Sequence, residues 1–256
     1  PDDDQRYHDE QEHLVATLES LGVLVHRPDE IEFTVTSTSQ CYARDPIVTI
    51  GNKLIIANMN VERRRQETGN YRRIALEVAA GYDGEVVSMP PLRPGYPEEN
   101  AYLEGGDVFV NGSEIYVGVT GNASNDRGIS WLREELGDAY TVHKIPLKKN
   151  VLHLDCAMML INERHGIICK HDFVDFDGLP ESLRGREWVE AAPEEAQVMA
   201  TNGVVVNPST VLLSDAFPDI ANGVRQMGIE VHELPFKKAN YFGGGLRCSY
   251  QPLARA

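Results

Sequence analysis

The sequence predicts an α/β fold made of a repeated strand–strand–helix–strand unit. Three observations lead to this prediction: apolar strand pairs recur along the chain, amphipathic helices ending in glycine stand between them, and each helix leads into a short strand that a proline stops. The repeat length of roughly fifty residues is typical of propeller-like architectures.

The helix–strand pattern occurs three times. Leu14, Leu18 and Leu21 show helical spacing in its first copy. Glycine is suited to end each helix because it adopts the left-handed backbone conformation readily, and proline is suited to end each strand. The copies are Gly22 with strand 23–28, Gly137 with strand 140–146, and Gly228 with strand 229–235. Their equivalent histidines, His26, His143 and His232, are interpreted as part of the scaffold.

Four β-hairpins are predicted from pairs of apolar runs separated by turn residues. The paired runs are 47–50 with 54–57, 108–110 with 115–117, 157–161 with 167–169, and 204–206 with 211–213. A polar residue opens each hairpin. If the units pack around a pseudo-axis, the starts of their first strands meet at one end, and these residues share one pocket. They are Asp45, Glu104, His153 and Asn202, with Cys248 where a fifth hairpin would begin.

Cys248 follows three glycines that end at Gly245, and glycine lets the backbone approach a substrate closely. His153 and Asp155 form a His-x-Asp pair elsewhere in the chain. A thiolate that attacks, a histidine that moves protons and carboxylates that hold a cation together suit nucleophilic thiol chemistry. By itself, Cys248 would favour a buried structural thiol. Cys156 is expected to face the core, because side chains alternate along a strand.

Composition limits the class of partner. The chain has 256 residues, 42% of them hydrophobic, and a net charge of -15. This charge argues against binding nucleic acid but is compatible with attracting a small cation. The basic run at 63–65 and the pair at 72–73 are interpreted mainly as a solvated helix face. No run approaches the ~20 apolar residues of a membrane span. Four cysteines without C-x-x-C spacing favour a reducing cytoplasm as the location of the protein. Scattered histidines and cysteines give only weak support for a zinc site.

Five motifs then resemble the guanidino-group-modifying superfamily, which includes arginine deiminases, dimethylarginine dimethylaminohydrolases, agmatine deiminases and arginine:glycine amidinotransferases. Those that resemble the deiminases are RDPIVTIGN at 44–52 with RRQET at 64–68, LEGGDV at 103–108, HLD at 153–155, and RC at 247–248 with PL at 252–253. The AN pair at 239–240, ahead of the glycines, resembles the amidinotransferase nucleophile loop.

The resemblance implies a five-bladed, pseudo-symmetric α/β propeller over one domain, residues 1–256, and it implies roles by position. Cys248 is the expected nucleophile, His153 the acid and base, and Glu104 the partner of the histidine or of the substrate. The substrate-binding residues it implies are Asp45 and Asp155, which grip the guanidinium, and Arg64, which helps bind a substrate carboxylate. Asp107 either joins the chemistry or fixes the Glu104 loop, and Asn202 and Gly245 are further candidates to line the pocket.

Two departures from the deiminases concern recognition of the α-carboxylate of arginine. Deiminases place one arginine just before the glycine run, where this chain has YF at 241–242, and another after the second hairpin, where it has GNAS at 121–124. The expected activity is hydrolysis of the guanidinium group of arginine or a related compound, with no metal or organic cofactor. The alternatives are amidino transfer to an amine and a non-catalytic binder, because a ribosome anti-association factor shares the propeller. The sequence also leaves open whether the protein forms a homo-oligomer.

Overall fold

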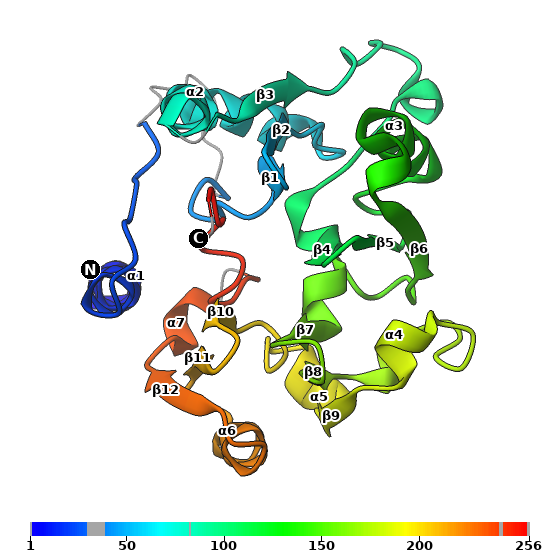
Figure 1. The fold of residues 1–256 in the computed structure, drawn as a ribbon. Helices are drawn as coiled ribbons and strands as arrows, with labels where there is room; N and C mark the ends of the chain where they lie inside the picture. Colours follow the sequence, from blue (N-terminus) through cyan, green and yellow to red (C-terminus); the bar gives the residue numbers. More distant parts are fainter. Residues whose placement is uncertain (1, 30–38, 82, 241–242, 255–256) are drawn as a thin grey trace. The chain divides into compact units, whose positions relative to one another are not determined.

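The computed structural model describes residues 2–29, 39–81, 83–240 and 243–254 (Figure 1). Contacts divide the chain into two compact units. Unit 1 comprises Pro1–Val25 with Asp155–Ser249, and unit 2 comprises His26–Leu154 with Tyr250–Ala256.

Unit 2 contains two three-stranded sheets, each with an antiparallel hairpin and a third strand parallel to the second. One sheet has β1 (Ile47–Ile50), β2 (Lys53–Ile56) and β3 (Glu85–Ser88), and the other has β4 (Val108–Asn111), β5 (Glu114–Val119) and β6 (Thr141–Pro146). Helices α2 (Arg72–Gly81) and α3 (Asp126–Leu136) make the crossovers, because parallel neighbours need a long connection. The 3₁₀ segments are η1 (Glu62–Tyr71), η2 (Pro97–Glu99), η3 (Gly105–Asp107) and η4 (Gly137–Ala139).

Unit 1 repeats the same plan in two further sheets. They consist of β7 (Met158–Leu160), β8 (His165–Ile168) and β9 (Glu187–Glu190), and of β10 (Val204–Asn207), β11 (Thr210–Ser214) and β12 (Glu230–Leu234). The helices are α1 (Asp2–Ser20), α4 (Glu181–Arg184), α5 (Pro193–Ala196), α6 (Pro218–Gln226) and α7 (Lys237–Asn240). The 3₁₀ turn η6 (Lys170–Asp172) lies in this unit, and η5 (Leu154–Cys156) stands at its boundary.

Each unit has its own apolar core. In unit 2, Ile115 and Val117 of β5 pack with Ile129 and Leu132 of α3. In unit 1, Val211 of β11 belongs to the equivalent cluster, together with apolar residues of α6. Burying apolar side chains of a helix against a strand is the main source of stability for a unit of this kind. The polar residues at the strand starts are therefore carried on a rigid frame.

The structure confirms the four hairpins and the helix–strand pairs α3–β6 and α6–β12. It also places Gly22, Gly137 and Gly228 at positive φ, as expected for helix ends. The strand predicted at 23–28 is wrong, since the described residues 23–29 are irregular. In the four sheets, a closing strand pairs with the hairpin that precedes it in sequence, whereas residues 23–29 belong to none of these sheets. Within the described residues, no helix is long and apolar enough to span a membrane.

Candidate active site

Three of the hairpin-opening residues meet in unit 2. Asp45 stands just ahead of β1, Glu104 precedes η3 and the start of β4, and His153 precedes η5. All three residues are buried, with 2–3% of their surface exposed. Glu104 and His153 are each followed by a 3₁₀ turn rather than by a strand, so strand alternation does not decide where their side chains point.

His153 lies between two carboxylates. Its Nε2 is 2.9 Å from Oε2 of Glu104, and its Nδ1 is 3.7 Å from Oδ1 of Asp45. Burial alone lowers the pKa of His153, but the charge of Asp45 and the hydrogen bond to Glu104 outweigh it and raise the pKa well above its ordinary value. The imidazole is therefore prepared to hold a proton, as a general acid requires.

Asp45 is oriented by groups on both of its oxygens. The backbone N–H of Gly106 donates to Oδ1 at 3.0 Å, and Nη1 of Arg64 donates to Oδ2 at 2.9 Å. Burial raises the pKa of Asp45, but the charges of His153 and Arg64 outweigh it and hold the pKa below 3.8. Gly106 permits this arrangement, because a Cβ there would lie 2.8 Å from both Asp45 Oδ1 and the His153 ring.

Arg64 does not belong to a solvated face. It is buried, and besides Asp45 it contacts Glu67, to which Nη2 donates at 3.0 Å. The solvated-face interpretation, made for most of the basic run, fits the exposed neighbour Arg63 and does not extend to Arg64. A role for Arg64 in binding a substrate carboxylate stays a prediction.

Asp107 connects the loops that carry Glu104 and His153. Its Oδ1 accepts a hydrogen bond from the backbone N–H of Leu154 at 3.0 Å, and its Oδ2 accepts one from that of Ser124 at 3.1 Å. The backbone N–H of Glu104 in turn donates to Oγ of Ser124 at 3.0 Å. Burial raises the pKa of Asp107 to about 7, although His153 and Ser124 act in the opposite direction. These contacts suit a residue that fixes the Glu104 loop.

In unit 1, Cys248 and Asp155 come together. Both are buried, and Sγ of Cys248 lies 4.0 Å from Oδ2 of Asp155. Nε of Arg247 lies 3.5 Å from the same oxygen. Both carboxylates predicted to bind a guanidinium thus face an arginine of their own unit. Cys156 is buried as predicted, but it stands in η5 rather than in a strand, and its Sγ donates to Oδ1 of Asp155 at 3.7 Å.

Asn202 bridges these two residues through their backbones. Its Nδ2 donates to the carbonyl oxygen of Asp155 at 3.2 Å, and its Oδ1 accepts from the N–H of Cys248 at 3.1 Å. Gly245 packs against this amide, and a Cβ at Gly245 would lie 2.5 Å from Oδ1 of Asn202. The structure therefore gives both residues a contact beside Cys248, and the predicted substrate contacts remain untested. The departure noted at 241–242 lies outside the described residues.

Several contacts of the site could not be found from sequence. Glu67 and Ser124 are buried partners of the cluster in unit 2, and Asn60 donates its backbone N–H to Oε1 of Glu104 at 2.9 Å. No local pattern marks any of them, because each meets its partner through the fold. The scaffold histidines fit their interpretation: His143 pairs with Glu114 on the neighbouring strand, and His232 pairs with Glu230 on its own.

The trio in unit 2 could also hold a metal ion by geometry alone. Asp45, Glu104 and His153 each offer a ligand atom, and these atoms lie within 4.8 Å of one another. A histidine must be neutral to bind a metal, and the raised pKa of His153 favours a proton in that place. A proton on His153 and a metal ion at this cluster therefore exclude each other.

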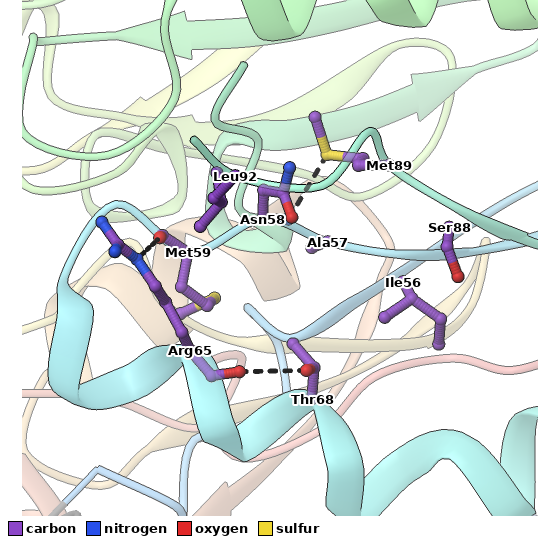
Figure 2. Close-up of a pocket in the computed structure, with 9 residues that line it drawn as sticks. All are labelled: Ile56, Ala57, Asn58, Met59, Arg65, Thr68, Ser88, Met89 and Leu92. Carbon is purple, nitrogen blue, oxygen red and sulfur yellow. Dashed lines mark hydrogen bonds between the residues drawn. The ribbon is translucent and has the colours of Figure 1, made fainter. Parts of the chain in front are cut away.

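A separate cavity of about 270 Å³ lies in unit 2, lined by residues that include Met59, Arg65 and Met89 (Figure 2). Its walls are mostly apolar, and Arg65 at its edge donates Nε to the carbonyl of Met59 at 3.1 Å. None of the predicted site residues lines it. Nη2 of Arg65 donates to the carbonyl of Asn60, whose N–H donates to the Glu104 carboxylate, so the backbone of Asn60 connects the two side chains.

The fold resembles those of known guanidino-modifying enzymes. The amidinotransferase SxtG of Microseira wollei superposes with a TM-score of 0.84 at 20% identity, over 97% of this chain and 83% of that one. DDAH from Pseudomonas aeruginosa gives 0.75 at 20% identity, over 94% and 86%. A putative inosamine-phosphate amidinotransferase of Streptomyces griseus is 26% identical over 93% of this chain and 76% of its own length.

These likenesses, with the buried carboxylate–histidine cluster and the Cys248–Asp155 pair, define an enzyme of the guanidino-group-modifying superfamily. Residues 3–255 match the family described as "N,N dimethylarginine dimethylhydrolase, eukaryotic". The chain belongs to this family.

Proposed function

We propose that this protein is a cysteine-dependent hydrolase that acts on the guanidinium group of arginine or a related compound. The observation that carries the proposal is the buried pair of Cys248 Sγ and Asp155 Oδ2, 4.0 Å apart. A carboxylate beside a thiol can hold a planar cation with its carbon next to the nucleophile. The proposal includes a five-bladed propeller over one domain, residues 1–256, with His153 as the acid and base.

The reaction starts when the Cys248 thiolate forms a C–S bond with the guanidinium carbon. His153 donates a proton to the departing nitrogen, and the C–N bond breaks, which leaves an amidino-thioether on Cys248. The neutral imidazole of His153 then accepts a proton from water, whose oxygen attacks the same carbon. The C–S bond breaks, the remaining hydroxyl proton passes to the released amine or to solvent, and a ureido product and the thiolate are released. These steps use no metal or organic cofactor.

Family membership favours hydrolysis of a methylated arginine as the first candidate reaction. In that reaction the small amine leaves and the alkyl chain stays on the intermediate. Free arginine is the second candidate substrate, with ammonia as the leaving group. The proposed partner is thus a small guanidino compound rather than nucleic acid or membrane, and the proposed location is the cytoplasm.

Amidino transfer is the second candidate function, and the Streptomyces griseus relative favours it. Here the alkyl amine leaves first, and an acceptor amine takes the place of water. The sequence GNAS at 121–124, which lacks the deiminase arginine, agrees with a substrate tail that differs from that of the deiminases. The two reactions share Cys248, His153 and the carboxylates, so the product distinguishes them.

The test is to incubate the protein separately with asymmetric dimethylarginine, with L-arginine, and with L-arginine plus glycine, and to identify products by mass spectrometry. Citrulline with dimethylamine or ammonia is the expected result. Ornithine with guanidinoacetate would establish the transferase instead. Agmatine and other guanidines follow if none of these reacts.

Cys248→Ser is the control for that assay. We expect it to lose turnover completely and to show no covalent adduct, because a serine hydroxyl is a far weaker nucleophile than a thiolate. If Cys248→Ser keeps the activity of the wild type, the covalent mechanism is wrong and the non-catalytic binder regains support.

A further inference from the structure

Resting on the proposed function, we infer that Asn202 is a positioning residue that sets the distance between the nucleophile Cys248 and the carboxylate of Asp155. A reaction of a bound cation with a thiol depends on how well the two groups are placed. Asn202 contacts the backbone of both residues and has no need to touch the substrate.

The hydrogen bonds of Asn202 leave the Cys248 loop little freedom in this region. Nδ2 donates to the carbonyl of Asp155, and Oδ1 accepts from the N–H of Cys248. The backbone carbonyl of Asn202 also accepts from the N–H of Arg247 at 3.1 Å. Two consecutive residues of the nucleophile loop are therefore bound to one asparagine, whose side chain is also bound to the Asp155 segment.

Burial makes this bridge specific. Asn202 is 2% exposed and Asp155 is fully buried, so water does not easily replace a lost contact. An amide is suited to the place because it offers one donor and one acceptor on opposite branches of the same group. An aspartate at this position would keep the acceptor for Cys248 but would set a carboxylate against the carbonyl of Asp155.

Gly245 supplies an independent argument. A Cβ at Gly245 would meet Oδ1, Cβ and Cγ of Asn202 at 2.5 to 2.9 Å. The backbone of Gly245 is not in the left-handed region, so the close approach of Asn202, and not backbone strain, requires glycine there. Glycine at 245 thus leaves room for the side chain of Asn202. The need for glycine at this position of the run is explained without any contact to the substrate.

The experiment measures alkylation of Cys248 in the full chain by two matched probes. 2-Chloroacetamidine is a planar cation, and 2-chloroacetamide is its neutral counterpart. In both cases the thiolate displaces chloride, a C–S bond forms, and the thiol proton passes to the buffer. The ratio of the two rate constants, read by mass spectrometry of the Cys248 peptide, reports how well Asp155 and Cys248 act on one ligand.

We expect the wild type to prefer the cation. Asn202→Ala is expected to reduce that preference by about 100-fold, because a displacement near 1 Å can cost that factor in a positioned reaction. The rate with the neutral probe should change much less. Gly245→Ala is expected to reproduce the effect. The double variant should reduce the preference for the cation no further than the more impaired single variant does, since both substitutions disturb one contact.

Folding is controlled with two variants. Asn202→Asp keeps the shape of the side chain and should also lower the preference, so it decides the question if Asn202→Ala does not fold. Thr210→Val removes a hydrogen bond from Oγ1 to Oε2 of Glu230 at 3.1 Å, which touches neither Asp155 nor the Cys248 loop, and keeps the amide bridge. It should lower the melting temperature and retain the preference for the cation.

A folded Asn202→Ala variant that retains the full preference would overturn the positioning role while leaving the proposed function intact. A wild type without selective labelling of Cys248 by the cation would overturn both. The two failures are therefore distinguishable in one series of measurements.

Discussion

Nε2 of His153 lies 2.9 Å from Oε2 of Glu104, and the two residues are 49 positions apart in the chain. Glu104 is held in turn by the N–H of Asn60 on its other carboxylate oxygen. A histidine in this setting keeps a proton that an isolated, buried imidazole would release. The pair therefore determines the protonation state of the group expected to act as acid.

Glu104→Gln should shift the pH dependence of activity. The variant removes one of the charges that raise the pKa of His153, so the limb of activity lost at high pH should move to lower pH, and kcat should fall about 100-fold. Titration of the His153 ring by NMR checks the cause. Glu114→Gln is the matched control, because Glu114 pairs with His143 at 3.0 Å outside the cluster.

The sign of the stability effect follows from the same shift. The folded state binds a proton on His153 more tightly than the unfolded state does, so the stabilisation is complete below pH 6.5 and is lost as pH rises through the raised pKa. A urea-denaturation series in Glu104→Gln should show a smaller loss over that window. An unchanged pH dependence of unfolding would contradict the assigned contact.

Asp107→Asn should make the free energy of unfolding depend less on pH between 3.8 and about 7. Because the pKa of Asp107 is raised from 3.8 to about 7, the wild type should lose stability as pH rises between these values. The asparagine cannot ionise, but it presents an amide donor to the N–H of Ser124, at a cost of about 1–3 kcal/mol. Urea unfolding from pH 4 to 7 measures both effects, with exposed Asp138→Asn as the control.

Arg64→Ala should destabilise the protein by about 3–5 kcal/mol, because it leaves the buried carboxylates of Asp45 and Glu67 without their common partner. Arg63→Ala, at an exposed neighbour, should stay within about 0.5 kcal/mol of the wild type. Chemical denaturation makes the comparison.

A second substitution at Arg64 tests its predicted contact with a substrate carboxylate. Arg64→Lys keeps the charge but not the forked geometry. If Arg64 binds the α-carboxylate, KM should rise for arginine and not for agmatine, which lacks that group. Equal changes for the two substrates would assign Arg64 to the support of Asp45 alone.

Gly106→Ala should reduce both activity and stability. The new Cβ would lie 2.8 Å from Asp45 and from the ring of His153, and overpacking of this kind costs about 1–3 kcal/mol. Gly81→Ala is the control, since nothing lies within 4 Å of its Cβ. It should be neutral or gain about 0.5–1 kcal/mol, because alanine is favoured over glycine in a helix. Thermal melts and kcat on both variants decide this.

The sequence by itself determined the repeated sheet unit and the candidate residues. Alternating apolar runs, turn residues and helix-ending glycines act over a few neighbouring positions, so they are visible in the chain, and the four hairpins followed from them. The strand expected at 23–28 failed because a strand also needs a partner, which local pattern does not supply.

Only the tertiary structure decided how the candidates are held. It turned Arg64 inward to Asp45 and Glu67, tied Ser124 and Leu154 to Asp107, and set Asn202 between Asp155 and Cys248. These partners stand up to 47 residues apart, as Asn202 and Asp155 do. Burial and hydrogen bonding between distant segments depend on the packed fold, because a polar group removed from water must find its partner wherever the chain brings one.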